Sequence, residues 1–227
     1  MSALDPDLAH YFADLAEKFA PLPADPTPLE RRSRYWTLCA LGRTALPSAV
    51  TMNDVQLDLE AGRVPVRLFY GHDGSGEPVP TIIYFHGGGW VVGDADTHTP
   101  TCARLAHEAN ALVVSVDYPL APEASWRTLT DACFQAANAI ATDRNAQEAG
   151  APIALAGDSA GAHLAAVTAI RARDEGNFHV ALQALIYPTI EPTYGTESYE
   201  RFAAGPGLTR ADTQWYWTQF VGAEHAL

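Results

Sequence analysis

Basic residues and long apolar runs are scarce in this sequence. Its 27 acidic residues outnumber its 14 basic residues, which gives a net charge of −13. Nucleic acids and anionic membranes bind clustered lysine and arginine, so we expect neither as a partner. No stretch approaches the roughly 20 apolar residues of a membrane-spanning helix.

Cysteine is also scarce, and its three positions are far apart: Cys39, Cys102 and Cys133. An odd number of cysteines without a CxxC pair or a Cys/His zinc spacing argues against a disulfide framework and a metal site. The first five residues lack the basic and apolar regions of a signal peptide. We therefore expect a cytoplasmic protein with reduced thiols.

The middle of the sequence contains four continuous apolar runs, at residues 81–85, 112–116, 153–156 and 180–186. Such runs are typical of parallel strands that are buried on both faces. Helical stretches lie between the runs, at residues 99–109, 128–142 and 160–173. The alternation predicts an α/β fold with a mostly parallel, doubly wound sheet. Alternating residues at 55–59 and 64–70 predict an antiparallel pair before it.

Both ends of the sequence lack this alternation. At the N-terminal end, Asp5-Pro6 is a good helix start, and a proline-rich linker and a second helix at about 29–43 follow. We expect these helices to form a cap. Residues 190–223 are rich in aromatics, and Thr209 is a good cap for a helix over 210–221. We divide the chain into cap helices, a core, and a cap insert with the C-terminus, at residues 1–45, 46–188 and 189–227.

The segment Gly157-Asp158-Ser159-Ala160-Gly161 fits the pattern G-x-S-x-G and lies between an apolar strand and a helix-forming run. Larger residues than Gly157 and Gly161 would collide with the adjacent strand and helix. The turn presents the Ser159 hydroxyl at the positive end of the helix, and the Ala160 amide is free to bind an oxyanion. We interpret Ser159 as a nucleophile; the alternative is a glycine-rich helix start that merely packs closely.

A second motif, His86-Gly87-Gly88-Gly89-Trp90, follows the strand at 81–85. Three glycines leave several backbone N–H groups uncovered, and such groups can stabilise negative charge on an acyl oxygen. We expect Gly87 to allow the turn, Gly88 and Gly89 to donate, and His86 to brace the loop. A phosphate-binding loop is the rival, but the segment lacks the lysine and hydroxyl residues of a P-loop.

These two motifs, in this order, resemble those of the hormone-sensitive-lipase-like (family IV) α/β-hydrolase esterases. The segments at 117–123 and 190–223 resemble that family's DYRLAPE segment and its cap insert. The resemblance implies an α/β-hydrolase fold, activity on short to medium acyl esters and no cofactor. By this match Ser159 is the nucleophile, while Gly88, Gly89 and Ala160 donate to the oxyanion. Pro119 departs from the family arginine, so we expect Glu123 to lack its partner.

A serine nucleophile also needs a histidine base, which a carboxylate orients. In this fold both follow the serine in the chain. We considered three histidines and judged each a poor base: His163, His179, and His225 with Asp212. The sequence therefore predicts that the triad Asp and His lie beyond residue 227 in a longer enzyme. The last apolar run then becomes an exposed edge strand that a C-terminal segment or a second copy covers.

Two functions remain open. The first is a carboxylic ester hydrolase that binds a small-molecule ester and is impaired in this chain. The alternative is a non-catalytic pseudo-hydrolase that binds a small ester or carboxylate, or a fragment that needs a complementing partner. The aromatic residues Trp215, Tyr216 and Trp217 fit an apolar acyl pocket and fit cap-to-core packing equally well.

Overall fold

A computed structural model describes residues 5–23, 25–71, 79–143 and 151–222. Its core is a six-stranded sheet with the order β1-β2-β4-β3-β5-β6. The strands are β1 (Thr51–Leu59), β2 (Gly62–Tyr70), β3 (Thr81–Phe85), β4 (Leu112–Val116), β5 (Ile153–Asp158) and β6 (Leu182–Ile186). The last four strands are parallel, and β1 and β2 are antiparallel to their neighbours. The predicted α/β class and its antiparallel pair are confirmed.

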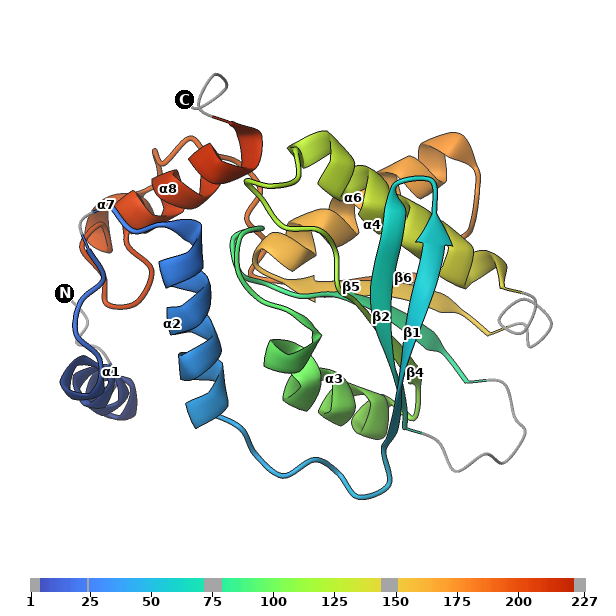
Figure 1. Cartoon of the computed structure of the whole chain (residues 1–227), viewed down its shortest axis with the longest axis horizontal. Helices are drawn as coiled ribbons and strands as arrows, with labels where there is room; N and C mark the ends of the chain where they lie inside the picture. Colours follow the sequence, from blue (N-terminus) through green and yellow to red (C-terminus); the bar gives the residue numbers. More distant parts are fainter. Residues whose placement is uncertain (1–4, 24, 72–78, 144–150, 223–227) are drawn as a thin grey trace.

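Helices cover both faces of this sheet (Figure 1). On one face, α4 (Trp126–Thr142) and α6 (Ala160–Glu175) pack on the larger apolar core, which includes Ile83, Leu155 and Leu164. On the other face, α3 (Ala95–Ala109) packs its small residues against a second cluster around Phe69. Burial on both faces explains why the central strands are continuously apolar.

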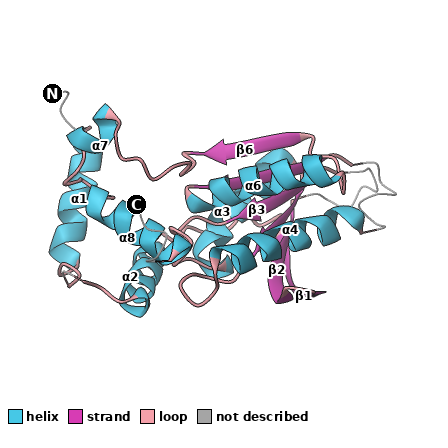
Figure 2. Cartoon of the chain, turned by 90° about the horizontal axis from the view of Figure 1, so that it is seen from above, coloured by secondary structure: helices cyan, strands magenta, loops and turns pink. Residues whose placement is uncertain are grey.

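The remaining helices gather at one end of the molecule, beyond the ends of the strands (Figure 2). They are α1 (Pro6–Lys18), α2 (Pro28–Leu41), α7 (Glu197–Arg201) and α8 (Arg210–Val221). Arg31 of α2 joins the two ends of the chain, because its guanidinium lies 2.9 Å from Asp212 and stacks 4.3 Å from the centre of the Trp215 ring. Helices α2 and α8, which are far apart in the sequence, therefore contact each other.

The register of the sheet brings the two glycine motifs together. Phe85, the last residue of β3, lies opposite Gly157 of the parallel strand β5. The segment that follows β3 begins at His86, and the turn that follows β5 holds Ser159. Both segments leave from the carboxyl ends of neighbouring strands, where open α/β sheets bind their ligands.

Several element boundaries differ from the sequence prediction; β6, for example, begins at Leu182 rather than residue 180. Helix α3 begins at Ala95 rather than residue 99, because Asp94 and Thr97 form a reciprocal capping box ahead of Pro100. Helix α4 begins at Trp126 rather than residue 128, because Ser125 caps it. The short helix α7 was not predicted at all.

Strand β6 forms one edge of the sheet among the described residues. Its Leu182 side chain is 58% exposed, and the strand carries no charged residue. The predicted apolar edge is therefore confirmed in position. No helix within the described ranges is both long and apolar enough to cross a membrane.

Candidate active site

Ser159 occupies the tight turn between β5 and α6, with φ of 51° and ψ of −117°. Residues other than glycine rarely adopt this conformation. The turn packs tightly against the end of β3, because a Cβ on Gly161 would lie only 2.0 Å from the Phe85 carbonyl oxygen. The steric argument for glycine at this position is confirmed. The serine side chain is half-buried, and its Oγ lies 3.4 Å from Oγ1 of Thr189.

The glycine loop after β3 folds into a compact turn. Gly88 and Gly89 have φ of 124° and 57°, which favour glycine. The Gly88 carbonyl accepts hydrogen bonds from the N–H groups of Val91 and Val92, at 3.1 and 2.9 Å. Within the part of the chain that the structure describes, no hydrogen bond uses the N–H of Gly88, Gly89 or Ala160. Gly88 and Gly89 are half-buried, whereas Ala160 is fully buried, and the role of all three as oxyanion donors stays a prediction.

Asp158 connects the serine turn to the glycine loop. Its Oδ1 accepts hydrogen bonds from Gly87 N at 3.0 Å and from the Tyr84 hydroxyl at 2.7 Å. Nε2 of His98 lies 3.3 Å from the same oxygen. Burial works to raise the pKa of Asp158, but the hydrogen bonds from His98, Tyr84 and Gly87 outweigh it and hold the pKa below its usual range. The ionised carboxylate fixes the loop beside the nucleophile turn.

His86 is fully buried beneath the glycine loop. Its Nδ1 lies 2.8 Å from the Gly87 carbonyl, its own carbonyl accepts from the Tyr118 hydroxyl at 2.6 Å, and its ring stacks on Tyr118 at 4.2 Å. Burial lowers the pKa of His86 to about 4. A neutral imidazole held in this way suits the bracing role expected for it.

A cavity of about 580 Å³ opens between the cap helices and these two turns. Ser159, Gly88 and Gly89 line its floor. The cap helices supply apolar walls, which include Phe12, Leu15, Tyr35, Leu38 and Tyr216. A cavity of this size and composition is typical of a small-molecule site.

The aromatic triplet of α8 divides its roles. Tyr216 lines the cavity, and a Cβ on Gly89 would lie 2.3 Å from its ring. Trp217 packs on Trp90 with ring centres 4.5 Å apart, while Trp215 stacks under the guanidinium of Arg31. Tyr216 and Trp217 both line the cavity, and Trp217 also packs the cap on the core. The interpretation of these residues as an acyl pocket stays a prediction.

No base faces Ser159 among the described residues. His163 lies one turn along α6, but its ring is enclosed by Trp90, Trp217 and Phe220, and its Nδ1 accepts from Trp90 Nε1 at 3.3 Å. Burial lowers the pKa of His163 to about 4.

The other candidate bases give no better geometry. His179 is exposed just before β6, and His225 lies outside the described residues. Asp212 caps α8 and pairs with Arg31. Within the described ranges, no three His, Cys, Asp or Glu side chains are grouped to hold a metal ion.

The expectation that Glu123 lacks a partner is wrong. Arg32 of α2 binds both carboxylate oxygens of Glu123, at 2.8 and 2.6 Å. The same guanidinium donates to the carbonyls of Val91 and Ala121, at 2.7 and 3.0 Å. An arginine from the cap is thus the partner of Glu123, which no local pattern around Pro119 could reveal.

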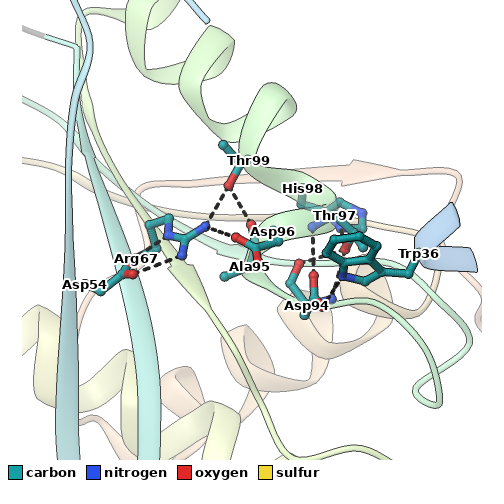
Figure 3. A network of polar contacts seen from close by, with 9 residues as sticks. All are labelled: Trp36, Asp54, Arg67, Asp94, Ala95, Asp96, Thr97, His98 and Thr99. Atoms are coloured by element: carbon teal, nitrogen blue, oxygen red, sulfur yellow. Dashed lines mark hydrogen bonds and ion pairs between the residues drawn. The ribbon is translucent and has the colours of Figure 1, made fainter. Parts of the chain in front are cut away.

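Sequence reasoning also missed His98 and the residues that hold it. Figure 3 shows the start of α3, where Asp94 accepts from Thr97 N at 2.8 Å and from Trp36 Nε1 at 3.1 Å. Arg67 of β2 binds Asp96 and Thr99 at this helix start, and Asp54 on the neighbouring strand β1. The pattern Asp-x-x-Thr was a usable capping signal, whereas the contact of His98 with Asp158 depends on the fold.

A serine at a strained strand–helix turn, beside a glycine loop with unused N–H donors, is the arrangement of serine hydrolases with a nucleophile elbow. The chain belongs to the alpha/beta hydrolase fold family, whose model matches residues 82–227. The resemblance to esterases of this fold is thereby confirmed.

Individual relatives agree with this assignment. Carboxylic ester hydrolase LipN of Mycobacterium tuberculosis is 37% identical over 179 residues, which are 76% of this chain and 47% of LipN. Ethyl acetate hydrolase of Pseudomonas putida is 30% identical over 96% of this chain and 71% of its own length. The esterase of the archaeon Pyrobaculum calidifontis superposes with a TM-score of 0.85 at 33% identity, over 96% of this chain and 71% of that one. The chain spans about half the length of the first curated relatives it matches.

Proposed function

We propose that this chain carries the nucleophile and the oxyanion hole of a carboxylic ester hydrolase for short to medium acyl esters. The observation that supports this most strongly is the arrangement of Ser159, whose half-buried hydroxyl lines the cavity next to the free N–H groups of Gly88 and Gly89. Three relatives that share the fold are named as ester hydrolases or esterases.

The proposed reaction follows from these groups. Ser159 Oγ attacks the carbonyl carbon of the ester, and its proton passes to a general base. The carbonyl oxygen takes the negative charge and receives hydrogen bonds from Gly88, Gly89 and Ala160. Collapse of this intermediate expels the alcohol, which takes the proton from the base, and leaves an acyl-serine that water hydrolyses.

We propose that the base and its orienting carboxylate come from residues outside the described ranges. His163 is enclosed by aromatic rings. Its Nδ1 already accepts a hydrogen bond from Trp90 and is not free to take the serine proton. The described residues alone would then react once with a strong electrophile but turn over esters slowly. We base the proposed preference for short to medium acyl chains on the apolar walls of the cavity.

The test uses a fluorophosphonate probe together with p-nitrophenyl acetate and butyrate. Wild-type protein should react covalently at Ser159, and Ser159→Ala should abolish the labelling and any ester turnover. Ser33→Ala is the matched control, because Ser33 is an exposed serine on α2. Equal labelling of wild type and Ser159→Ala would remove Ser159 from the mechanism. Saturable binding of the esters without any labelling would favour a non-catalytic binding protein instead.

A further inference from the structure

Helix α2 uses two neighbouring stripes of its surface for different contacts. Arg31, Tyr35 and Leu38 recur at helical spacing and line the cavity above Ser159. Arg32 and Trp36, four residues apart, form the adjacent stripe and reach the segment that follows the glycine loop. One helix therefore touches both the cavity and the loop that is proposed to bind the oxyanion.

The contact of Arg32 with this loop is direct. Its Nε donates to the Val91 carbonyl at 2.7 Å, and the N–H of that same Val91 closes the turn by donating to the Gly88 carbonyl. Its terminal nitrogen donates to Ala121, whose own N–H donates to the Trp90 carbonyl at 2.9 Å. The guanidinium thus holds the outer end of the Gly88–Val91 turn from two directions.

Other contacts make Arg32 the link between cap and loop. Asp158 holds the inner end of the loop through Gly87, from the core of the molecule. Trp36 adds one hydrogen bond from α2 to Asp94, just beyond the loop (Figure 3). Glu123 orients the Arg32 guanidinium by accepting from two of its nitrogens. A planar donor group with a fixed orientation is well suited to bind two carbonyls at once.

We propose that Arg32 is a positioning residue for the oxyanion loop, so that helix α2 is both a wall of the cavity and a brace of the Gly88–Val91 turn. This inference rests on the proposed function, since it assigns the loop to oxyanion binding. A loop that loses this brace keeps its sequence and its glycines but samples positions in which the N–H groups of Gly88 and Gly89 no longer converge. Small displacements of this kind are costly to a reaction that depends on preorganised donors.

The first measurement is the rate of Ser159 labelling by a fluorophosphonate over a range of probe concentrations. Arg32→Ala should lower the maximum labelling rate about 10- to 100-fold, with little change in the half-saturating concentration, and Arg32→Lys should fall between. Arg171→Ala is the matched control: the Arg171 side chain is 33% exposed, against 28% for Arg32, and it also pairs with carboxylates, but it lies on α6. Arg171→Ala should label at the wild-type rate.

The second measurement is hydrogen exchange of the peptide that contains residues 87–93. Its amides should exchange faster in Arg32→Ala than in wild type and in Arg171→Ala. When wild-type Ser159 reacts, the proposal stands only if both changes occur, and labelling within twofold of wild type, or unchanged exchange, overturns it. If wild-type Ser159 fails to react, the proposed function fails, and the exchange result alone decides whether Arg32 braces the loop. If Arg32→Ala does not fold, Arg32→Lys replaces it in both measurements.

Discussion

On the side of Ser159 that faces the glycine loop, buried groups are hydrogen-bonded to one another. On the side that faces β6, which we call the open side, the described residues are more exposed. The carboxylate of Asp158 accepts from Gly87 and Tyr84 and lies beside His98, at the inner end of the glycine loop. Toward β6, the backbone of Ser159 bonds to Ile186 and Thr189, at 2.9 and 3.4 Å. On this second side, Ile186 and Tyr187 are 43% and 71% exposed.

The difference separates two requirements of the chemistry. Stabilisation of negative charge needs donors that are fixed before the substrate arrives, and the side that we propose to bind the oxyanion holds such groups. Proton transfer needs a base within hydrogen-bonding reach of Ser159 Oγ. Of the described residues, only Thr189 places a side-chain oxygen near that atom, and a hydroxyl is a poor base. Among the described residues, this side of Ser159 therefore supplies no effective base.

The largest effect on stability is expected from a substitution that removes the hydrogen bonds between Asp158 and the glycine loop. Asp158→Ala leaves the buried donors of Gly87 and Tyr84 without their acceptor, and such unsatisfied groups cost about 1–3 kcal/mol each. We expect a loss of about 2–4 kcal/mol in the free energy of unfolding, measured by urea denaturation. Asp58→Ala is the control, because Asp58 is exposed on β1 and pairs only with its neighbour Arg63. A loss below about 1 kcal/mol would show that Asp158 does not hold the two turns together.

A smaller effect concerns pH. Burial lowers the pKa of His163 from 6.5 to about 4, so between these values the unfolded chain binds a proton that the folded chain does not. Stability then falls as the pH falls through this window, by up to about 1.4 kcal/mol per pH unit. His86 acts in the same direction, and Asp117, whose pKa burial raises to about 6, acts in the opposite direction.

The contribution of His163 is isolated by comparison with His163→Phe. Phenylalanine keeps the aromatic packing against Trp90 but cannot bind a proton. We expect the unfolding free energy of wild type, relative to that of the variant, to fall as the pH is lowered from 7 to 6 and 5. The measurement is urea denaturation at each pH. A constant difference would mean that His163 is accessible to protons in the folded protein, which would restore it as a candidate base.

The smallest effect on stability is expected at the open side. Leu182→Lys places a charge on the exposed edge strand β6, and we expect the free energy of unfolding to change by less than about 0.5 kcal/mol. Self-association, measured by light scattering against concentration, should decrease, because a charged edge resists strand pairing. Met52→Lys on β1, the opposite edge, is the matched control at 47% exposure. Equal scattering from both variants would show that β6 does not mediate association.

Local patterns predicted the elements that surround the serine. Helix α8 has the predicted bounds because Thr209 and Asp212 form a capping box within one turn. The turn at Ser159 was predictable because strand, glycines and helix are consecutive in the sequence. In each case the determining contacts lie within a few residues of one another.

The contacts that complete the site were not predictable in this way. Arg32 and Glu123 are 91 residues apart, and nothing near either residue indicates the other. His98 reaches Asp158 only because α3 packs on the sheet beside β5's carboxyl end. The three donors that Asp158 meets also come from other segments of the chain.

Ser159 itself carries a further consequence through its backbone angles. A residue other than glycine in such a conformation costs about 1–3 kcal/mol, which the rest of the fold must offset. Glycine at this position would relieve that cost, so serine is not the most stable residue for this turn. Under the proposed function, serine here exchanges stability of the fold for a reactive hydroxyl at this point.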